Sequence, residues 1–298
     1  MATLQKITPF LWFDKEAKEA AEFYVSLFGK NSKIKEITTI HNTPSGDCEI
    51  VSFELLGQPF MAISAGPLFK FNPSISFHIK CKMKGEVDTI WKGLSERGTV
   101  LMELGAYPWS EKYGWVQDKY GLSWQVIFVG DGRIEQKITP ALMFVGDVCG
   151  KAEEAVNFYT TVFHNAKADI TARYGKGEEP DREGTVKYAA FTLEGQEFGI
   201  MDSAHKHSFT FNESISFSVY CDTQEEIDYY WKKLSADPKA EQCGWLKDKY
   251  GVSWQIVPTI MEKMMQDKDE KKLARVTEAF LKMKKFDIEG LKKAYNGK

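Results

Sequence analysis

The sequence predicts an α+β protein of four βαβββ modules, and an internal duplication is the first observation behind this prediction. Residues 113–127 (YGWVQDKYGLSWQVI) and 243–257 (CGWLKDKYGVSWQIV) are identical at nine of fifteen positions. FNPSISFHIKC at 71–81 is matched by FNESISFSVYC at 211–221, and ITPFLWF and AAEFY are matched by ITPALMF and AVNFY. Because the matches keep their order along the chain, one structural unit is used twice.

Alternating strand-like and helix-like stretches are the second observation, and they divide each copy into two modules. In the first module we expect a strand, a helix and three further strands, over residues 7–13, 15–28, 33–41, 48–56 and 59–65. In the second module we expect an alternating strand at 74–82, a helix at 86–97 and three strands up to residue 129. The second copy repeats this pattern but lacks about ten residues before its Gly-Trp pair.

The repeat boundaries predict the domain organisation. Residues 1–130 form the first domain, residues 138–258 form the second, and the short polar stretch between them is the linker. Residues 259–298 lie outside the repeat. This extension has apolar residues near helical spacing, namely Leu273, Val276, Phe280 and Met283. We expect it to form helices that pack on the second domain, the last one capped by Asp287.

Composition limits the classes of function. The formal net charge of −3 gives no support for a nucleic-acid partner or an anionic membrane, and no apolar run approaches the length of a membrane span. The N-terminal residues lack the apolar stretch of a signal peptide, and the five cysteines form no CxxC pair. We therefore expect a cytoplasmic protein whose cysteines are reduced, with the two domains pairing within a monomer.

The repeated motifs resemble a known family. ITPFLWF with AAEFYVSLFG, FNPSISFHIKC and GWVQDKYGLSWQVI are similar to the PhnB-like branch of the vicinal oxygen chelate superfamily. That superfamily includes glyoxalase I, extradiol dioxygenases and bleomycin-resistance proteins, and the branch is often described as 3-demethylubiquinone-9 3-methyltransferase. The resemblance covers both copies and part of the tail. It implies that pairs of modules curl into half-open barrels around a cavity, and that the protein is bacterial.

Strand alternation predicts which side chains enter such a cavity. In the strand at 74–82 the apolar set is Ile75, Phe77, Ile79 and Cys81, so we expect these residues to face the helices. The polar alternates then lie on the concave face. The same reasoning on the first and last strands of the first copy gives further inward side chains, and Trp115 is added as an aromatic residue expected to line the cavity. The predicted ligand-binding set is Thr8, Phe10, Trp12, Ser76, His78, Lys80, Trp115 and Gln125.

The resemblance also implies where a divalent metal would bind. In the superfamily's enzymes, His, Glu or Gln on the first, fourth, fifth and eighth strands hold the metal. The matching positions here are Thr8 and Thr139, Ser76 and Ser216, Gln125 and Gln255, and the neighbourhood of Ala62 and Ile200. Hydroxyl and carboxamide groups are weak ligands for a transition metal. We therefore expect no bound metal and no other cofactor.

Other catalytic motifs are few. The sequence has no GxSxG, P-loop or HExxH motif, and no glycine-rich turn after its first strand that would support a methyltransferase of the usual type. The Asp118-Lys119 and Asp248-Lys249 pairs precede Tyr-Gly, and this pattern indicates a turn rather than an acid/base pair. His205 lies two residues before a second histidine in an expected loop.

The sequence favours a protein that binds a small organic ligand, anionic or aromatic, without metal chemistry. We expect the site to lie in the first copy, because Phe10, Trp12 and Lys80 have no equivalents of the same type in the second. One alternative is a metal-dependent lyase, isomerase or dioxygenase that uses His78 and Gln125 as ligands. Another is a scaffold or interaction protein with filled barrels. No catalytic residue is assigned.

Overall fold

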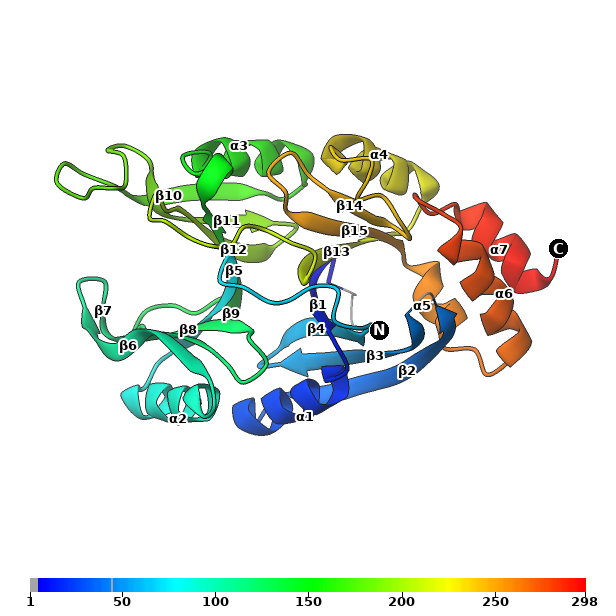
Figure 1. Cartoon of the computed structure of the whole chain (residues 1–298), viewed down its shortest axis with the longest axis horizontal. Coiled ribbons are helices and arrows are strands. Elements are labelled where there is room, and N and C mark those ends of the chain that lie inside the picture. Colours follow the sequence, from blue (N-terminus) through cyan, green and yellow to red (C-terminus); the bar gives the residue numbers. More distant parts are fainter. Residues whose placement is uncertain (1–4, 44) are drawn as a thin grey trace.

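The computed structural model describes residues 5–43 and 45–298, which form two strongly curved sheets placed back to back (Figure 1). The sheets have seven and eight strands, and they are called here the seven-stranded and the eight-stranded sheet. Their concave faces open in opposite directions, and the helices cover their convex faces (Figure 1). The predicted α+β class is confirmed.

The elements follow the predicted order closely. The first copy contains β1 (Ile7–Phe13), α1 (Ala17–Phe28), β2 (Lys33–Thr43), β3 (Gly46–Leu55), β4 (Gln58–Ser64), β5 (Ile75–Cys81), α2 (Lys84–Ser95), β6 (Thr99–Tyr107), β7 (Ser110–Gln117) and β8 (Ser123–Phe128). The second copy contains β9 (Ile138–Phe144), a 3-10 turn η1 (Gly146–Val148), α3 (Ala152–Val162), β10 (Lys167–Arg173), β11 (Val186–Leu193), β12 (Gln196–Asp202), β13 (Ile215–Cys221), α4 (Gln224–Leu234), β14 (Trp245–Lys247) and β15 (Ser253–Pro258).

The last module is shorter than the others. β6 and β7 form a hairpin in the first copy, whereas the second copy has only the three-residue β14 at this place. Among the described residues, the stretch 235–244 contains no strand that corresponds to β6. This is the region where the sequence lacks about ten residues, so the deletion removes one strand of the fourth module.

Each sheet combines strands from both copies. The seven-stranded sheet has the order β14-β15-β13-β1-β4-β3-β2, and the eight-stranded sheet has the order β10-β11-β12-β9-β5-β8-β7-β6. β1 pairs with β13 and β5 pairs with β9, both antiparallel, with Phe10 opposite Ser216 and His78 opposite Thr139. The ranges 1–130 and 138–258 therefore delimit the two sequence copies, whereas each curved sheet is built by both.

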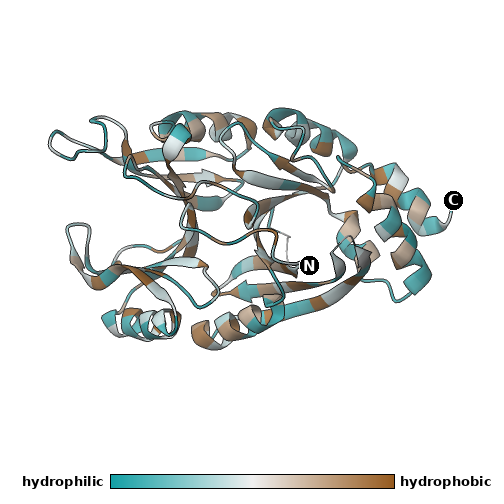
Figure 2. Cartoon of the chain, in the orientation of Figure 1, coloured by the Kyte–Doolittle hydropathy of each residue, from teal (hydrophilic) through white to brown (hydrophobic). Residues whose placement is uncertain are grey.

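Alternation along the strands places the core on the convex side of each sheet. Ile75, Phe77, Ile79 and Cys81 are at most 2% exposed, as the apolar alternates of β5 should be. The helices contribute their apolar stripes to the same layer, and in Figure 2 α2 and α4 carry long hydrophilic stretches on the surface that they leave outside. The polar alternates of the central strands are consequently left for the concave faces.

The repeated DKYGxSWQ motif is a buried structural network. Asp118 Oδ2 accepts hydrogen bonds from the Tyr24 hydroxyl (2.7 Å) and from Trp124 Nε1 (2.8 Å). Its Oδ1 accepts from the backbone N–H groups of Tyr120 (2.9 Å) and Leu122 (3.1 Å). Burial raises the pKa of Asp118, and these four donors act in the opposite direction. Asp118 therefore joins helix α1, a turn and strand β8.

The second copy repeats this network and confirms that the motif forms a turn. Asp248 accepts from the Tyr159 hydroxyl (2.7 Å), from Trp254 Nε1 (2.9 Å) and from two backbone N–H groups of its own turn. Gly121 and Gly251 lie in these turns with φ of 85° and 87°, a conformation that a side chain would strain. The Asp-Lys pairs thus belong to turn chemistry, as predicted.

The C-terminal extension forms three helices, α5 (Ile260–Met265), α6 (Glu270–Leu281) and α7 (Ile288–Asn296), at the open end of the seven-stranded sheet (Figure 1). Asp287 caps α7 by accepting from the backbone N–H of Glu289 (3.1 Å), as predicted. The extension packs on the second copy and also reaches the first, because Gln266 donates to Glu36 of β2 (2.8 Å). Within residues 5–43 and 45–298, no helix is long and apolar enough to span a membrane.

Candidate ligand-binding site

The structure divides the predicted site residues between two faces. Thr8, Phe10 and Trp12 lie on β1 in the seven-stranded sheet, whereas Ser76, His78, Lys80, Trp115 and Gln125 lie on β5, β7 and β8 in the eight-stranded sheet. The expectation of one site within the first copy is therefore wrong in this respect. Local sequence pattern orients each side chain within its strand, but it does not determine which module pairs with which.

Aromatic rings gather on the concave face of the seven-stranded sheet. Phe10 is only 8% exposed and meets the ring of Trp245 edge-on at 5.8 Å between centroids. Trp12 contacts the same ring at 6.1 Å and donates from Nε1 to the carbonyl of Gly66 (2.8 Å). Ser253 Oγ is buried without a hydrogen-bond partner among the described residues. Ring packing and the tail helices together occupy this side of the molecule.

The equivalent positions on the eight-stranded sheet are small. Ala141 replaces Phe10, and Gly199 replaces Met61 of β4, according to the alignment of the two copies. The Tyr188 side chain of β11 packs over these two small residues. A Cβ added to Gly199 would lie 3.2 Å from the ring and the hydroxyl of Tyr188 and 3.4 Å from Ala141 Cβ. Glycine at 199 therefore allows the Tyr188 ring to lie flat across the sheet.

His78 lies beside this ring at the centre of the concave face. The His78 and Tyr188 rings are nearly parallel, 16° apart, with centroids separated by 5.9 Å. His78 Nε2 is buried and has no hydrogen-bond partner within the part of the chain that the structure describes. Burial, with a contribution from Lys80, lowers the pKa of His78 to about 4 although the Gln125 side chain beside it acts in the opposite direction, so the imidazole is neutral near neutral pH.

The depressed pKa of His78 predicts loss of stability in mild acid. Between about pH 6.5, where an exposed imidazole titrates, and about pH 4, the unfolded chain binds a proton that the folded chain does not. The free energy of unfolding should then fall by roughly 2 kcal/mol more in the native protein than in a His78→Ser variant between about pH 7 and pH 5. Urea unfolding of both proteins at the two pH values measures this. Equal losses would contradict the assigned environment.

Gln125 is held rigidly next to His78 in the register of β5 and β8. Its Nε2 donates to Ser76 Oγ (2.8 Å), and its Oε1 accepts from the Tyr113 hydroxyl (2.5 Å). Burial raises the pKa of Tyr113, and the negative charges that Tyr107 and Tyr188 would carry if ionised raise it further. Tyr113 of the first copy and Tyr188 of the second thus meet on one face, with the carboxamide near them.

An ion pair crosses the face between the two copies. Lys80 Nζ of β5 contacts a carboxylate oxygen of Glu197 of β12, and Thr139 Oγ1 lies 3.4 Å from the same oxygen. The Glu197 backbone N–H donates to Gln136 Oε1 (2.9 Å), which fixes this end of β12. A partly buried lysine needs a counter-charge, and Glu197 supplies it. Lys80 is therefore already paired, and it does not by itself indicate an anionic ligand.

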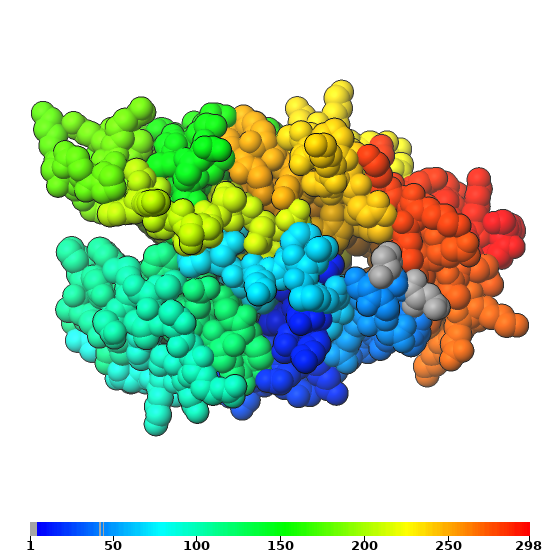
Figure 3. Space-filling view, in the orientation of Figure 1, coloured from blue at the N-terminus to red at the C-terminus, as the bar shows by residue number. Residues whose placement is uncertain are grey.

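The β6–β7 hairpin forms the outer edge of the face. Tyr107 and Trp109 stack at 5.1 Å, and both rings contact Tyr113 edge-on at 5.5 Å. Trp109 is 53% exposed although it is a large aromatic residue. Figure 3 shows an open gap at the left between this lobe and the lobe that carries β10 and β11. A chain of rings therefore leads from solvent towards Gln125.

The concave faces do not fit a divalent metal. Gln125 Oε1, the atom that a metal would bind, already accepts from Tyr113, whereas Gln255 donates from Nε2 to Ser216 Oγ (2.9 Å). Thr8 and Thr139 supply only hydroxyl groups at the first-strand positions. Within residues 5–43 and 45–298, no three His, Cys, Asp or Glu side chains converge as metal ligands would.

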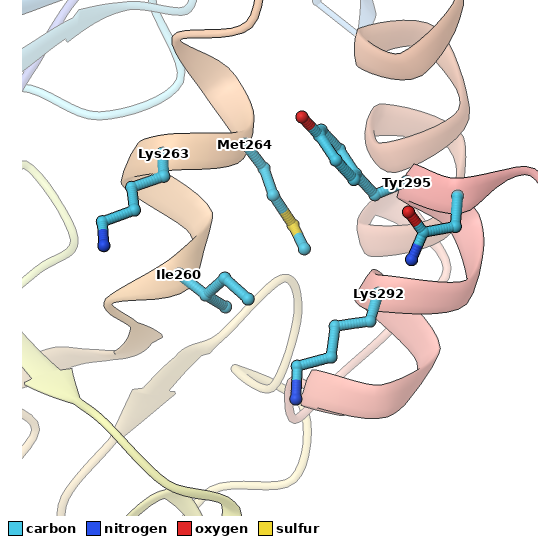
Figure 4. A pocket seen from close by; sticks show the side chains of 6 residues that line it. Ile260, Lys263, Met264, Lys292 and Tyr295 are labelled. Carbon is cyan, nitrogen blue, oxygen red and sulfur yellow. The ribbon is translucent and has the colours of Figure 1, made fainter.

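The described part of the chain has two further cavities, and neither is lined by His78 or Tyr188. One of about 330 Å³ separates α5 from α7, and Figure 4 shows Met264 and Tyr295 pointing towards each other across it while the Lys263 ammonium points away. The other, of about 310 Å³, lies where the copies meet and is lined by polar groups that include Gln58 and Glu197. The first is a gap between tail helices, and the second adjoins the Lys80–Glu197 pair.

Several residues of this face were missed by the sequence-based reasoning. Tyr188, Gly199 and Glu197 come from the second copy, and Tyr113 precedes the Gly-Trp pair of the first. One signal was present, because Lys80 and Glu197 are replaced together at the equivalent positions by Tyr220 and an uncharged proline. A correlated gain of opposite charges in two copies indicates contact between the strands that carry them.

Comparisons with known proteins identify one family in both copies. The family model described as 3-demethylubiquinone-9 3-methyltransferase matches residues 5–127 and 136–257. The PhnB protein of Bacillus cereus, which bears the same description, is 42% identical over 42% of this chain and 100% of its own, with a TM-score of 0.39. A protein from Staphylococcus aureus is 32% identical over 41% of this chain and 95% of its own, with a TM-score of 0.18.

A more distant likeness spans both copies. Glyoxalase I from Zea mays is 12% identical, covers 87% of this chain and 94% of its own length, and has a TM-score of 0.53. At this identity the likeness shows the fold alone. No curated protein matches the chain. With the family model matched once in each copy, the chain belongs to the PhnB-like family described as 3-demethylubiquinone-9 3-methyltransferase.

Proposed function

We propose that the protein binds a small organic molecule on the concave face of the eight-stranded sheet, beside His78. The observation that carries this proposal is the buried His78 Nε2, which lacks a hydrogen-bond partner among the described residues. Leaving such a nitrogen unpaired costs about 1–3 kcal/mol, and a ligand atom would recover that cost. Aromatic walls with a few convergent polar groups are the usual form of a small-molecule site.

The Tyr188 ring is the part of the face that a ligand would displace. It covers Gly199 and lies parallel to His78, but the 5.9 Å between the two centroids is longer than in a tight stack. Moving this ring would uncover the imidazole and leave the Gln125 carboxamide in place. The seven-stranded sheet also holds a buried polar atom without a partner among the described residues, Ser253 Oγ, but Phe10 and Trp245 pack across its face.

The proposal does not include methyl transfer or metal chemistry. The family description names a methyltransferase, but the side chains of this face supply an imidazole, a carboxamide and phenols, and the metal positions carry hydroxyl groups. We place the protein in the bacterial cytoplasm, where it acts as a monomer. The five free cysteines and the related chains from Bacillus and Staphylococcus support the location, and the pairing of strands from both copies within one chain supports the monomer.

Matched substitutions in the two sheets test the proposed site. A library of small uncharged organic compounds is screened by thermal shift, and the affinity of each hit is measured by quenching of tryptophan fluorescence. We expect His78→Ser and Gln125→Ala each to weaken binding at least about tenfold, as loss of one buried hydrogen bond should. Gln255→Ala, the equivalent change in the other sheet, should leave affinity within about twofold.

The same measurements can overturn the proposal. His78→Ser restores the residue type found at the equivalent Ser218, so a general loss of folding is not expected from it. Hits that are weakened by Gln255→Ala and not by His78→Ser would move the site to the seven-stranded sheet. A screen in which no compound binds the native chain would favour a scaffold role.

A further inference from the structure

We infer that this face selects flat molecules that carry no net charge, an inference that rests on the proposed function. Its first basis is the Lys80–Glu197 ion pair, whose side chains are 22% and 23% exposed. An anionic ligand that took Lys80 would leave the Glu197 carboxylate partly buried without its partner, which is costly. A cationic ligand that took Glu197 would leave Lys80 in the same position.

The neighbouring polar groups are also uncharged. His78 is a neutral imidazole, and Gln125 presents a carboxamide whose atoms are held by Ser76 and Tyr113. These groups offer hydrogen bonds to a polar ligand without attracting either sign of charge. In the other sheet the positions equivalent to Lys80 and Glu197 are Tyr220 and a proline. The two sheets therefore differ by both charges of the ion pair and not by one charge alone.

The shape preference comes from the rings on both sides of the face. Tyr188 lies parallel to His78 on one side, and the stacked pair of Tyr107 and Trp109 reaches Tyr113 on the other. Such surfaces favour planar aromatic bodies by stacking and edge contacts. The chemical class that fits is an uncharged heteroaromatic molecule with a hydrogen-bonding edge directed at His78 Nε2.

Two fluorescent probes with one ring skeleton separate charge from shape. N-phenyl-1-naphthylamine is neutral, and 8-anilinonaphthalene-1-sulfonate adds a sulfonate to the same rings. We expect the neutral probe to bind the native chain at least about tenfold more tightly, because the sulfonate has to break the ion pair. Glu197→Gln, which leaves Lys80 unpaired, should shift this ratio towards the sulfonate by at least about tenfold.

Two further variants complete the design. Lys80→Met with Glu197→Gln removes both charges and should restore the preference for the neutral probe. Glu54→Gln breaks the Lys35–Glu54 pair, whose carboxylate side chain is also 23% exposed but lies outside the face, and should change neither affinity. Both affinities should fall in His78→Ser if the probes occupy the proposed site.

The outcomes distinguish failure of the charge preference from failure of the proposed site. If His78→Ser weakens both probes but the sulfonate binds the native chain more tightly, the inference about charge is overturned and the proposed site stands. A ratio that Glu197→Gln leaves unchanged also overturns it. If His78→Ser affects neither probe, the proposed site fails. Failure of the neutral probe to bind the native chain overturns the inference as well.

Discussion

Replacing Asp118 by alanine is expected to lower the free energy of unfolding by about 4 kcal/mol. The substitution leaves four donors without their acceptor, namely the Tyr24 hydroxyl, Trp124 Nε1 and two backbone N–H groups. Trp124 is fully buried, so water cannot replace the lost bond at its ring nitrogen. Urea unfolding followed by tryptophan fluorescence measures the loss.

Graded substitutions show whether the loss of stability in Asp118→Ala comes from the lost hydrogen bonds or from the lost side-chain volume. Tyr24→Phe removes one donor and should cost about 1 kcal/mol. Asp118→Asn keeps the volume and one carbonyl oxygen but turns an NH₂ group towards two donors, so it should fall between the other two variants. A loss in Asp118→Ala no larger than in Tyr24→Phe would show that the carboxylate does not organise the motif.

The second large effect is expected from cutting the chain within residues 130–137. β1 finds its antiparallel partner β13 in the other half of the chain, and β5 finds β9 there. Separated halves would leave these strand edges unpaired and their apolar faces uncovered. We expect the halves to fold together when they are mixed, and to be unfolded or self-associated when alone. Size-exclusion chromatography with circular dichroism distinguishes these states.

A cut within residues 266–269 is the control, because it leaves both sheets intact and should yield a folded protein with the mass of one chain. A half that is a folded monomer with a cooperative unfolding transition would contradict the need for pairing between copies. Halves that neither fold nor associate when mixed would count against dividing the chain at residues 130–137.

The sequence predicted the elements well because their signals are local. Period-two alternation in β5 placed Phe77 and Ile79 in the core, and the capping pattern identified Asp287. The comparison of the two copies also located a deletion of about ten residues before Gly244. None of these signals depends on which strands become neighbours. They therefore predict the elements correctly for any arrangement of the modules.

The candidate site was predicted only in part, because its formation depends on pairing between copies. His78, Lys80 and Gln125 were identified from alternation. Tyr188 beside His78 and Glu197 paired with Lys80 were not, because each lies more than a hundred residues away from its partner in the sequence. Phe10 and Trp12 were assigned to the same site and lie instead on the other sheet. Hydrophobic patterns report the face on which a side chain lies, and they contain no information about sheet order.

The tail helices at the end of the seven-stranded sheet have a consequence for stoichiometry. Two identical halves would create two equivalent faces, and a substitution in one would appear in both. In this chain the halves differ, so one face could fill with aromatic rings behind α5–α7 while the other stayed open. Covalent fusion thereby allows the two faces to differ, so that the proposed site predicts a single ligand per chain and the other face serves packing.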